Sequence, residues 1–248
     1  MNRLGDALRK ALHANPPALG FRPTEPTKPH MVLIAAISEA SNNVASWTQG
    51  AEAVIFGPSL KPRELKSATK ALTVPWGVWI DSATSHPAEP AGTDFVIFEP
   101  DKAGLELMSN ECLGKVLALN ASHDNTLLHG ICELPVEAIY LKRAPQDIFT
   151  LQELMQCRRL ADLVTKPLLV PVAPDTPPIH FKTLWEAGVD GVVVTATAEN
   201  SLKALRLEID RLGLRARRKW LRARPLVPIT SPVLPLNQND EDESEDAE

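Results

Sequence analysis

The fold is decided by residues Leu184–Val194, which read LWEAGVDGVVV. Gly188 suits the left-handed backbone position that ends a helix. Val192–Val194 is a β-branched apolar run, typical of a parallel strand that is covered on both faces. Two other stretches repeat this order of glycine, acidic residue and apolar strand: GAEAVIF at residues 50–56 and GTDFVIF at residues 92–98. Such a repeated unit predicts an α/β barrel or a doubly wound parallel sheet.

Working outward from this stretch, apolar runs of strand length recur along the chain. Parallel strands need crossovers of about a dozen residues, and helical patterns follow most of these runs. The segment 82–91 is the exception, since it is short and contains two prolines. No glycine-rich dinucleotide fingerprint follows the first run, which disfavours the competing flavodoxin-like or Rossmann sheet. Eight β/α units therefore predict a compact (β/α)8 TIM barrel. The eight runs are at residues 31–37, 53–56, 74–80, 95–98, 115–119, 136–141, 167–172 and 191–195.

Composition divides the chain into four parts. Residues 1–30 hold a short helix, with leucines four residues apart, and a proline-rich connector. The barrel is expected over residues 31–213, and a helix ahead of it could plug its amino-terminal end. Residues 214–236 are first basic, in Arg215–Arg224, and then proline-rich. Residues 237–248 form an acidic tail that is expected to be disordered.

The net charge of the barrel itself does not favour binding to a polyanion such as DNA. Residues 240–248 hold seven carboxylates, and removing these from the net charge of −5 leaves +2. No apolar run reaches the length of a membrane span, and the N-terminus lacks the apolar core of a signal peptide. Cys112, Cys132 and Cys157 form no CxxC pair, so we expect reduced thiols in a cytoplasmic protein.

No metal site is predicted, because the histidines are scattered and none forms an i, i+4 pair with carboxylates. They are His13, His30, His86, His123, His129 and His180. The sequence also lacks a GxSxG elbow and a P-loop.

The active site of such a barrel forms at the carboxyl ends of its strands. The side chains at these ends fall into acid/base candidates and candidates for binding a ligand. Several of them, together with Asp101 and Asp175, stand where helices begin, so helix capping or simple solvation is the alternative role. The acid/base candidates are Glu39, Asp81, Glu99 and Lys142, and the ligand-binding candidates are Asn120, Thr195 and Thr197.

Lys142 is the most informative of these residues because it directly follows an apolar strand. Strand alternation places it on the same side as Ala138 and Tyr140. If this side faces the barrel axis, the amine, the phenol and the Glu99 carboxylate converge, which favours Schiff-base or proton-transfer chemistry. If it faces outward, Lys142 is a surface cation.

The stretch from Phe181 to Val194 resembles the last β/α unit of phosphate-binding TIM barrels. Indole-glycerol-phosphate synthase, thiamine-phosphate synthase, the histidine-biosynthesis isomerases and related flavin-binding barrels belong to this superfamily. The resemblance implies that backbone N–H groups after strands seven and eight hold a phosphate, here around 173–176 and 195–198. The first of these loops departs from the glycine-rich family pattern, since residues 173–178 read APDTPP.

Two functions therefore stay open. One is a lyase, isomerase or aldolase that acts on a small phosphorylated or flavin-like ligand. The other is a non-catalytic barrel that binds nucleic acid, an anionic membrane or an acidic protein through Arg215–Arg224. A barrel mouth with carboxylates converging on Lys142 favours the first, and a mouth lined by alkyl groups and prolines favours the second. Cofactor, substrate and oligomeric state do not follow from the sequence.

Overall fold

The chain forms a closed eight-stranded barrel. The computed structural model describes residues 3–12, 30–38, 43–60, 62–70, 72–80, 92–144, 149–197 and 201–213. Each strand lies parallel to its neighbours, and the first strand pairs with the eighth. This closure confirms the (β/α)8 barrel and excludes the open sheet. The strands are β1 (Val32–Ile37), β2 (Ala53–Phe56), β3 (Trp76–Ile80), β4 (Phe95–Phe98), β5 (Gly114–Leu119), β6 (Ala138–Leu141), β7 (Leu168–Val172) and β8 (Gly191–Thr195).

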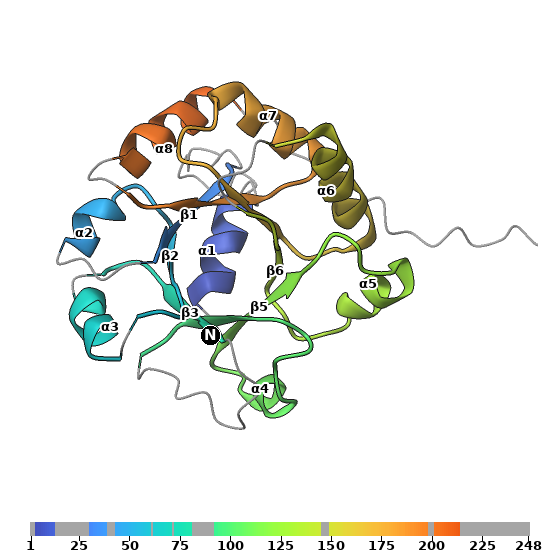
Figure 1. Cartoon of the computed structure of the whole chain (residues 1–248), viewed down its shortest axis with the longest axis horizontal. Coiled ribbons are helices and arrows are strands. Elements are labelled where there is room, and N and C mark those ends of the chain that lie inside the picture. Colours follow the sequence, from blue (N-terminus) through green and yellow to red (C-terminus); the bar gives the residue numbers. More distant parts are fainter. Residues whose placement is uncertain are drawn as a thin grey trace, which may run out of the picture.

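The helices form an outer ring around these strands, except for α1, which lies inside the ring (Figure 1). They are α1 (Arg3–Leu12), α2 (Val44–Trp47), α3 (Pro62–Thr69), α4 (Glu106–Ser109), α5 (Asn125–Ile131), α6 (Leu151–Leu163), α7 (Pro178–Ala187) and α8 (Ser201–Arg211).

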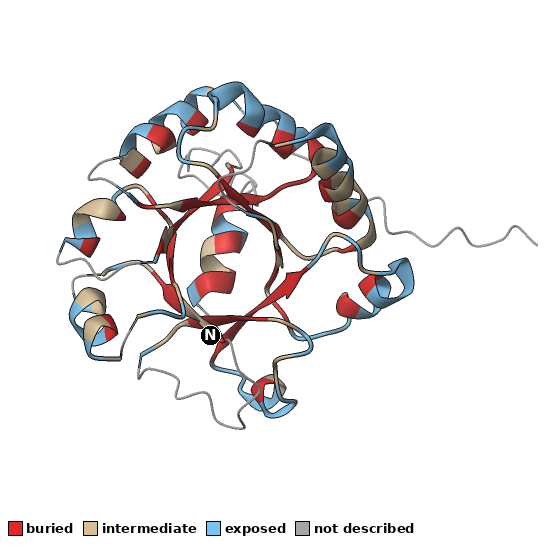
Figure 2. Ribbon diagram, viewed as in Figure 1, coloured by how far each residue is buried: buried red, intermediate tan, exposed pale blue. Residues whose placement is uncertain are grey.

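Two hydrophobic cores follow from the alternation of side chains along each strand. The outer core lies between the strands and the surrounding helices. The inner core fills the barrel axis, where Leu4, Leu8 and Ala11 of α1 pack against strand residues such as Val32 and Ala138. Figure 2 shows buried residues along the strands and on the inward sides of the helices. Arg3 pairs with Asp94 and donates to the Thr73 carbonyl, so α1 sits at the amino-terminal end of the barrel.

The repeated acidic residue seen in the sequence has one structural role. Glu52, Asp94, Glu137 and Asp190 directly precede the even-numbered strands, and each carboxylate accepts a backbone N–H from the beginning of the preceding strand. The acceptor distances run from 2.6 Å for Glu137 to 3.0 Å for Asp94. Each acidic residue also donates its own N–H to the carbonyl of the same partner residue. The four residues therefore fasten the strands in pairs at the amino-terminal end.

A glycine stands two residues before three of these four acidic residues, Glu52, Asp94 and Asp190. Gly50, Gly92 and Gly188 have φ values of 96°, 97° and 109°, which other residues rarely adopt. The unit that contains Glu137 has no such glycine, which is why its membership in the repeat was not evident from the sequence.

The expected helix beginnings are partly corrected by the structure. Asp101 does not cap a helix, because residues 99–102 form a turn and α4 begins only after Leu105, without a side-chain cap. Asp175 is not a cap either, since α7 follows Pro177. Asp124 does cap α5, accepting the Thr126 N–H at 2.9 Å.

Candidate functional site

A pocket of about 350 Å³ opens at the carboxyl ends of the strands, where a barrel of this class carries its active site. It draws on six of the eight strands or the residues that follow them. Its described lining consists of Ala36, Ile37, Ser38, Ile55, Gly57, Pro58, Trp79, Tyr140, Pro171, Val193 and Thr195. Alkyl groups and prolines dominate this lining, and no charged side chain occurs among the described residues that form it.

Two aromatic rings form one corner of the pocket. The centroids of Trp79 and Tyr140 lie 5.1 Å apart, and the rings are nearly perpendicular, at 88°. Burial raises the pKa of Tyr140 to about 12, so its phenol stays neutral and can donate a hydrogen bond near neutral pH. The other hydroxyls of the lining belong to Ser38 and Thr195.

Pro171 lies beyond the backbone pairing between β6 and β7. That pairing ends at Tyr140 and Leu169, and Pro171 has no N–H to donate. Arg143 contacts this part of β7. Its guanidinium donates to the Pro171 carbonyl at 2.9 Å and to Glu153 at 2.8 Å.

Arg143 thereby joins three elements near the pocket. Its side chain is only 6% exposed and lies over the Phe149 ring, 4.6 Å from the ring centroid. Glu153 also closes the capping box with Thr150 at the start of α6. Burial raises the pKa of Glu153, but hydrogen bonds from Arg143 and Thr150 outweigh this effect and leave the pKa lowered. No sequence pattern predicts these contacts, because Arg143 resembles an ordinary loop cation.

Glu99 and Lys142 meet at the carboxyl ends of β4 and β6, which they directly follow. Ala138 and Tyr140 belong to the inner core, and alternation continued past the end of β6 predicts the same side for Lys142. The Lys142 ammonium donates to the Glu99 carboxylate at 2.6 Å, and Lys102 contacts the other carboxylate oxygen at 3.2 Å. The hydrogen bond from Lys142 lowers the pKa of Glu99. The pair is partly open to solvent, with side-chain exposures of 34% for Lys142 and 18% for Glu99.

The other sequence candidates are spread around the mouth. Thr195 lines the pocket, whereas Asn120 and Thr197 are exposed and are not among its described lining. The Asn120 carbonyl accepts the His123 N–H and faces a ring nitrogen of the same histidine at 2.9 Å. Glu39 and Asp81 lie outside the described residues.

The loop after β7 offers few groups to a phosphate. Pro174, Pro177 and Pro178 have no N–H, and the Thr176 N–H is already donated to the Ala173 carbonyl. The His180 N–H likewise bonds to the Pro177 carbonyl at 2.9 Å. Asp175 is exposed in this loop and would repel an anion.

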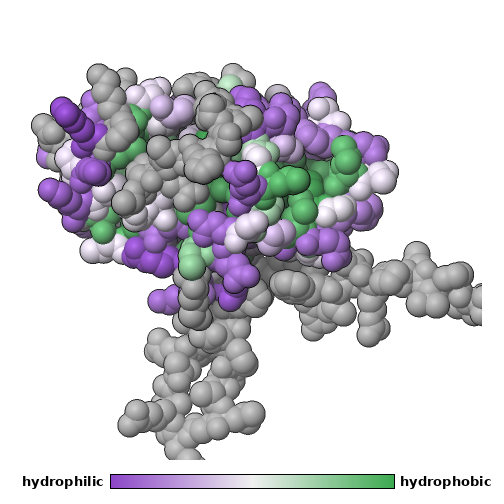
Figure 3. All heavy atoms as spheres, turned by 90° about the horizontal axis from the view of Figure 1, so that it is seen from below, coloured by the Kyte–Doolittle hydropathy of each residue, from purple (hydrophilic) through white to green (hydrophobic). Residues whose placement is uncertain are grey.

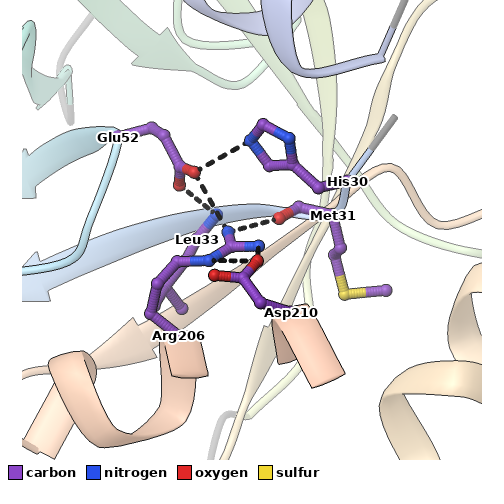
Figure 4. Close-up of polar contacts among 6 residues, drawn as sticks. All are labelled: His30, Met31, Leu33, Glu52, Arg206 and Asp210. Atoms are coloured by element: carbon purple, nitrogen blue, oxygen red, sulfur yellow. Dashed lines mark hydrogen bonds and ion pairs between the residues drawn. The ribbon is translucent and has the colours of Figure 1, made fainter. Parts of the chain in front are cut away.

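A second group of charges lies at the opposite end of the barrel (Figure 4). Glu52 accepts the Leu33 N–H and contacts His30 at 3.2 Å and Arg206 at 3.0 Å. Arg206 also donates to the Met31 carbonyl and pairs with Asp210. These groups satisfy one another and connect α8 to the beginnings of β1 and β2, which is a structural role.

The face shown in Figure 3 is mostly hydrophilic, with a larger group of apolar side chains toward the right and smaller ones toward the left. Leu105 and Leu127 are among the exposed apolar residues, at 88% and 64%. No helix in the described part of the chain is long and apolar enough to cross a membrane. The described residues also contain no cluster of three or more histidine, cysteine or acidic groups that could hold a metal ion.

The fold and pocket together define a (β/α)8 barrel with a small-molecule-sized cavity at its carboxyl-terminal mouth. Among solved structures, the chain is similar to a mutant tryptophan synthase α subunit of Pyrococcus furiosus. The two share 14% identity and superpose with a TM-score of 0.56 over 75% of this chain and 99% of that chain. Tryptophan synthase of Mycobacterium tuberculosis gives 15% identity and a TM-score of 0.58, over 75% and 93% of the two chains. At this identity the similarity shows the fold. No protein-family model and no curated protein matches the sequence.

Proposed function

We propose that the chain is a small-molecule-binding barrel, with the pocket at its carboxyl-terminal mouth as the binding site. The single observation that carries the proposal is the pocket itself, since a volume of about 350 Å³ lies within the range of ligand cavities. Its position is where barrels with this topology bind their ligands. The fold neighbours, which are named as tryptophan synthases, act on small molecules and support the same choice.

Gly57 allows this proposal to be tested by filling the pocket. It lines the cavity, and a Cβ atom there would meet only Ile37 O and Ser38 Cα, both at 3.5 Å, which is ordinary contact. Gly57→Leu should therefore occupy the pocket while the barrel remains folded. Gly104→Leu is the matched control, because a Cβ atom at Gly104 meets nothing within 4 Å and Gly104 is not part of the described lining.

The test uses isothermal titration calorimetry with the full chain and two probes, 1-naphthol and 1-naphthyl phosphate. The proposal expects at least one probe to bind, Gly57→Leu to weaken that binding at least about tenfold, and Gly104→Leu to leave it unchanged. Binding that Gly57→Leu does not alter, or no binding of either probe, would overturn the proposal.

A second candidate function is enzymatic, and the Glu99–Lys142 pair favours it. The pair combines an amine and a carboxylate at 2.6 Å, with the lysine on the same side of its strand as Tyr140. In a lyase or aldolase role, the neutral amine would condense with a carbonyl group and lose water to form an imine. Benzaldehyde with borohydride tests this step, because hydride converts the imine to a stable amine. An adduct that persists in Lys142→Ala argues against the role.

The interaction through Arg215–Arg224 remains a prediction, as this segment lies outside the described residues. If the acidic tail masks the segment, deleting residues 239–248 should strengthen salt-sensitive binding to heparin. Unchanged heparin binding would count against the masking.

A further inference from the structure

The pocket lining sorts into three kinds of surface. Ala36, Ile55 and Val193 supply alkyl groups, and Pro58 and Pro171 supply rigid apolar rings. Trp79 and Tyr140 supply aromatic faces and edges. Contact with all three surfaces favours the binding of a flat apolar molecule, because apolar surface is removed from water and aromatic rings pair favourably edge to face.

Charge at the pocket is unfavourable for an anion. The described lining residues carry no cation, and the transfer of an unpaired phosphate from water into such a lining is unfavourable. The nearby Lys142 is already bound to Glu99, and Lys102 shares the same carboxylate. An anion could recruit Lys142 only by breaking an ion pair of 2.6 Å. Arg143, which donates to the carbonyl of the lining residue Pro171, is likewise paired with Glu153 at 2.8 Å.

The loop after β7 removes the usual alternative, which is a cradle of backbone N–H groups. Three of its positions are prolines, and the N–H groups of Thr176 and His180 are bonded within the loop and the helix start. Among the described lining residues, the side-chain groups that can hydrogen-bond a ligand are the hydroxyls of Ser38, Tyr140 and Thr195 and the Trp79 indole N–H. The Tyr140 phenol belongs to the aromatic corner itself, and burial raises its pKa to about 12, so its proton is retained near neutral pH.

From this arrangement we infer that the pocket takes an uncharged, planar aromatic ligand that packs against Trp79 and presents a hydrogen-bond acceptor to the Tyr140 hydroxyl. The inference rests on the proposed function and names the chemical class of its ligand. The pocket then differs from the phosphate site that the family resemblance implies, because its described lining is apolar and aromatic.

The charge of the ligand is tested with the same two probes, which share a naphthalene ring and differ by a phosphate. Calorimetry at pH 7.5 should give a dissociation constant for 1-naphthol that is at least about tenfold lower than that of 1-naphthyl phosphate. Equal or tighter binding of the phosphate, lost in Gly57→Leu, would overturn this inference and leave the proposed function standing. If neither probe binds, or if Gly57→Leu alters neither, both are overturned.

Tyr140→Phe tests the hydrogen bond to the ligand. This test is independent of whether the Gly57→Leu variant folds. Removing one hydroxyl should weaken 1-naphthol about fivefold and leave naphthalene, which has no acceptor oxygen, unchanged. Trp47→Phe is the control, since Trp47 packs against the outer core and is not in the described lining of the pocket. An unchanged affinity of Tyr140→Phe for 1-naphthol, or an equal loss for naphthalene, would contradict the assigned role of the phenol.

Discussion

Replacing Asp190 with alanine should destabilise the barrel more than any change to an exposed acidic residue of the same chain. Asp190 is 3% exposed, and its carboxylate accepts the Leu168 N–H at 2.8 Å in a buried position. The alanine variant leaves this N–H without its acceptor inside the protein. A buried unsatisfied group costs about 1–3 kcal/mol, and a charged acceptor places the loss toward the upper part of that range.

We therefore expect Asp190→Ala to lower the free energy of unfolding by about 2–3 kcal/mol, measured by urea denaturation. Asp190→Asn keeps an oxygen acceptor and should lose about 1 kcal/mol. Asp175→Ala is the matched control, because Asp175 is exposed and caps no helix, so its change should stay within about 0.5 kcal/mol. A loss in Asp190→Ala no larger than that of Asp175→Ala would refute the fastening role of the four acidic residues.

Three further predictions concern other parts of the molecule. Gly77→Ala should lower the free energy of unfolding by about 3 kcal/mol or more, because a Cβ atom would lie 2.4 Å from the Phe95 ring and 2.5 Å from the Phe95 carbonyl oxygen. Gly104→Ala should change this free energy little, and equal effects of the two variants in urea denaturation would contradict the close packing at Gly77. Lys142→Met should raise the pKa of Glu99, measured by carbon-detected NMR titration, and an unchanged Glu99 titration would show that the pair is not formed. Because the pKa of Glu99 is lowered in the folded chain, the ion pair stabilises the fold above pH 4.5, and this stabilisation is lost as pH falls through the folded pKa. The free energy of unfolding of Lys142→Met should therefore fall less over this pH range. Iodoacetamide should label exposed Cys112 first and Cys157 last, because burial raises the pKa of the Cys157 thiol to about 12; early labelling of Cys157 in the native chain, read by mass spectrometry, would contradict its burial.

The barrel was predictable because its signals are local. The β-branched runs and the glycine-acid pairs at Gly50–Glu52, Gly92–Asp94 and Gly188–Asp190 mark strands regardless of what they pack against. The acid Glu137 escaped notice because Pro135 stands where the other units have glycine. The shared bond pattern of all four appears only when the preceding strand is placed beside each one.

The candidate site was less predictable because it depends on which side of each strand faces the axis. Alternation predicts that Lys142 shares a side with Tyr140, and the structure brings Lys142 to Glu99. Alternation along β3 places Trp79 on the same side of the strand as Gly77. An aromatic residue within an apolar run does not by itself indicate a neighbouring cavity. The role of Arg143 depends on Pro171, 28 residues later in the chain, and no local pattern connects the two.

The sequence left two kinds of barrel mouth open, one with carboxylates at Lys142 and one lined by alkyl groups and prolines. The structure has features of both. The Glu99–Lys142 ion pair stands on the rim, and the pocket beside it is lined by alkyl, proline and aromatic groups. Binding and chemistry are thus separable by mutation, since Gly57→Leu addresses the pocket and Lys142→Ala addresses the ion pair.

The most direct measurement is an NMR titration of the isotope-labelled full chain with 1-naphthol. If the ligand binds in the pocket, the largest chemical-shift changes should fall on the Trp79 indole N–H and on the backbone amides of Gly57, Val193 and Thr195. Glu52 and Arg206, at the opposite end of the barrel, should change little. Changes concentrated on the outer helices or at the amino-terminal end, with the Trp79 signal unmoved, would contradict a ligand site at the barrel mouth.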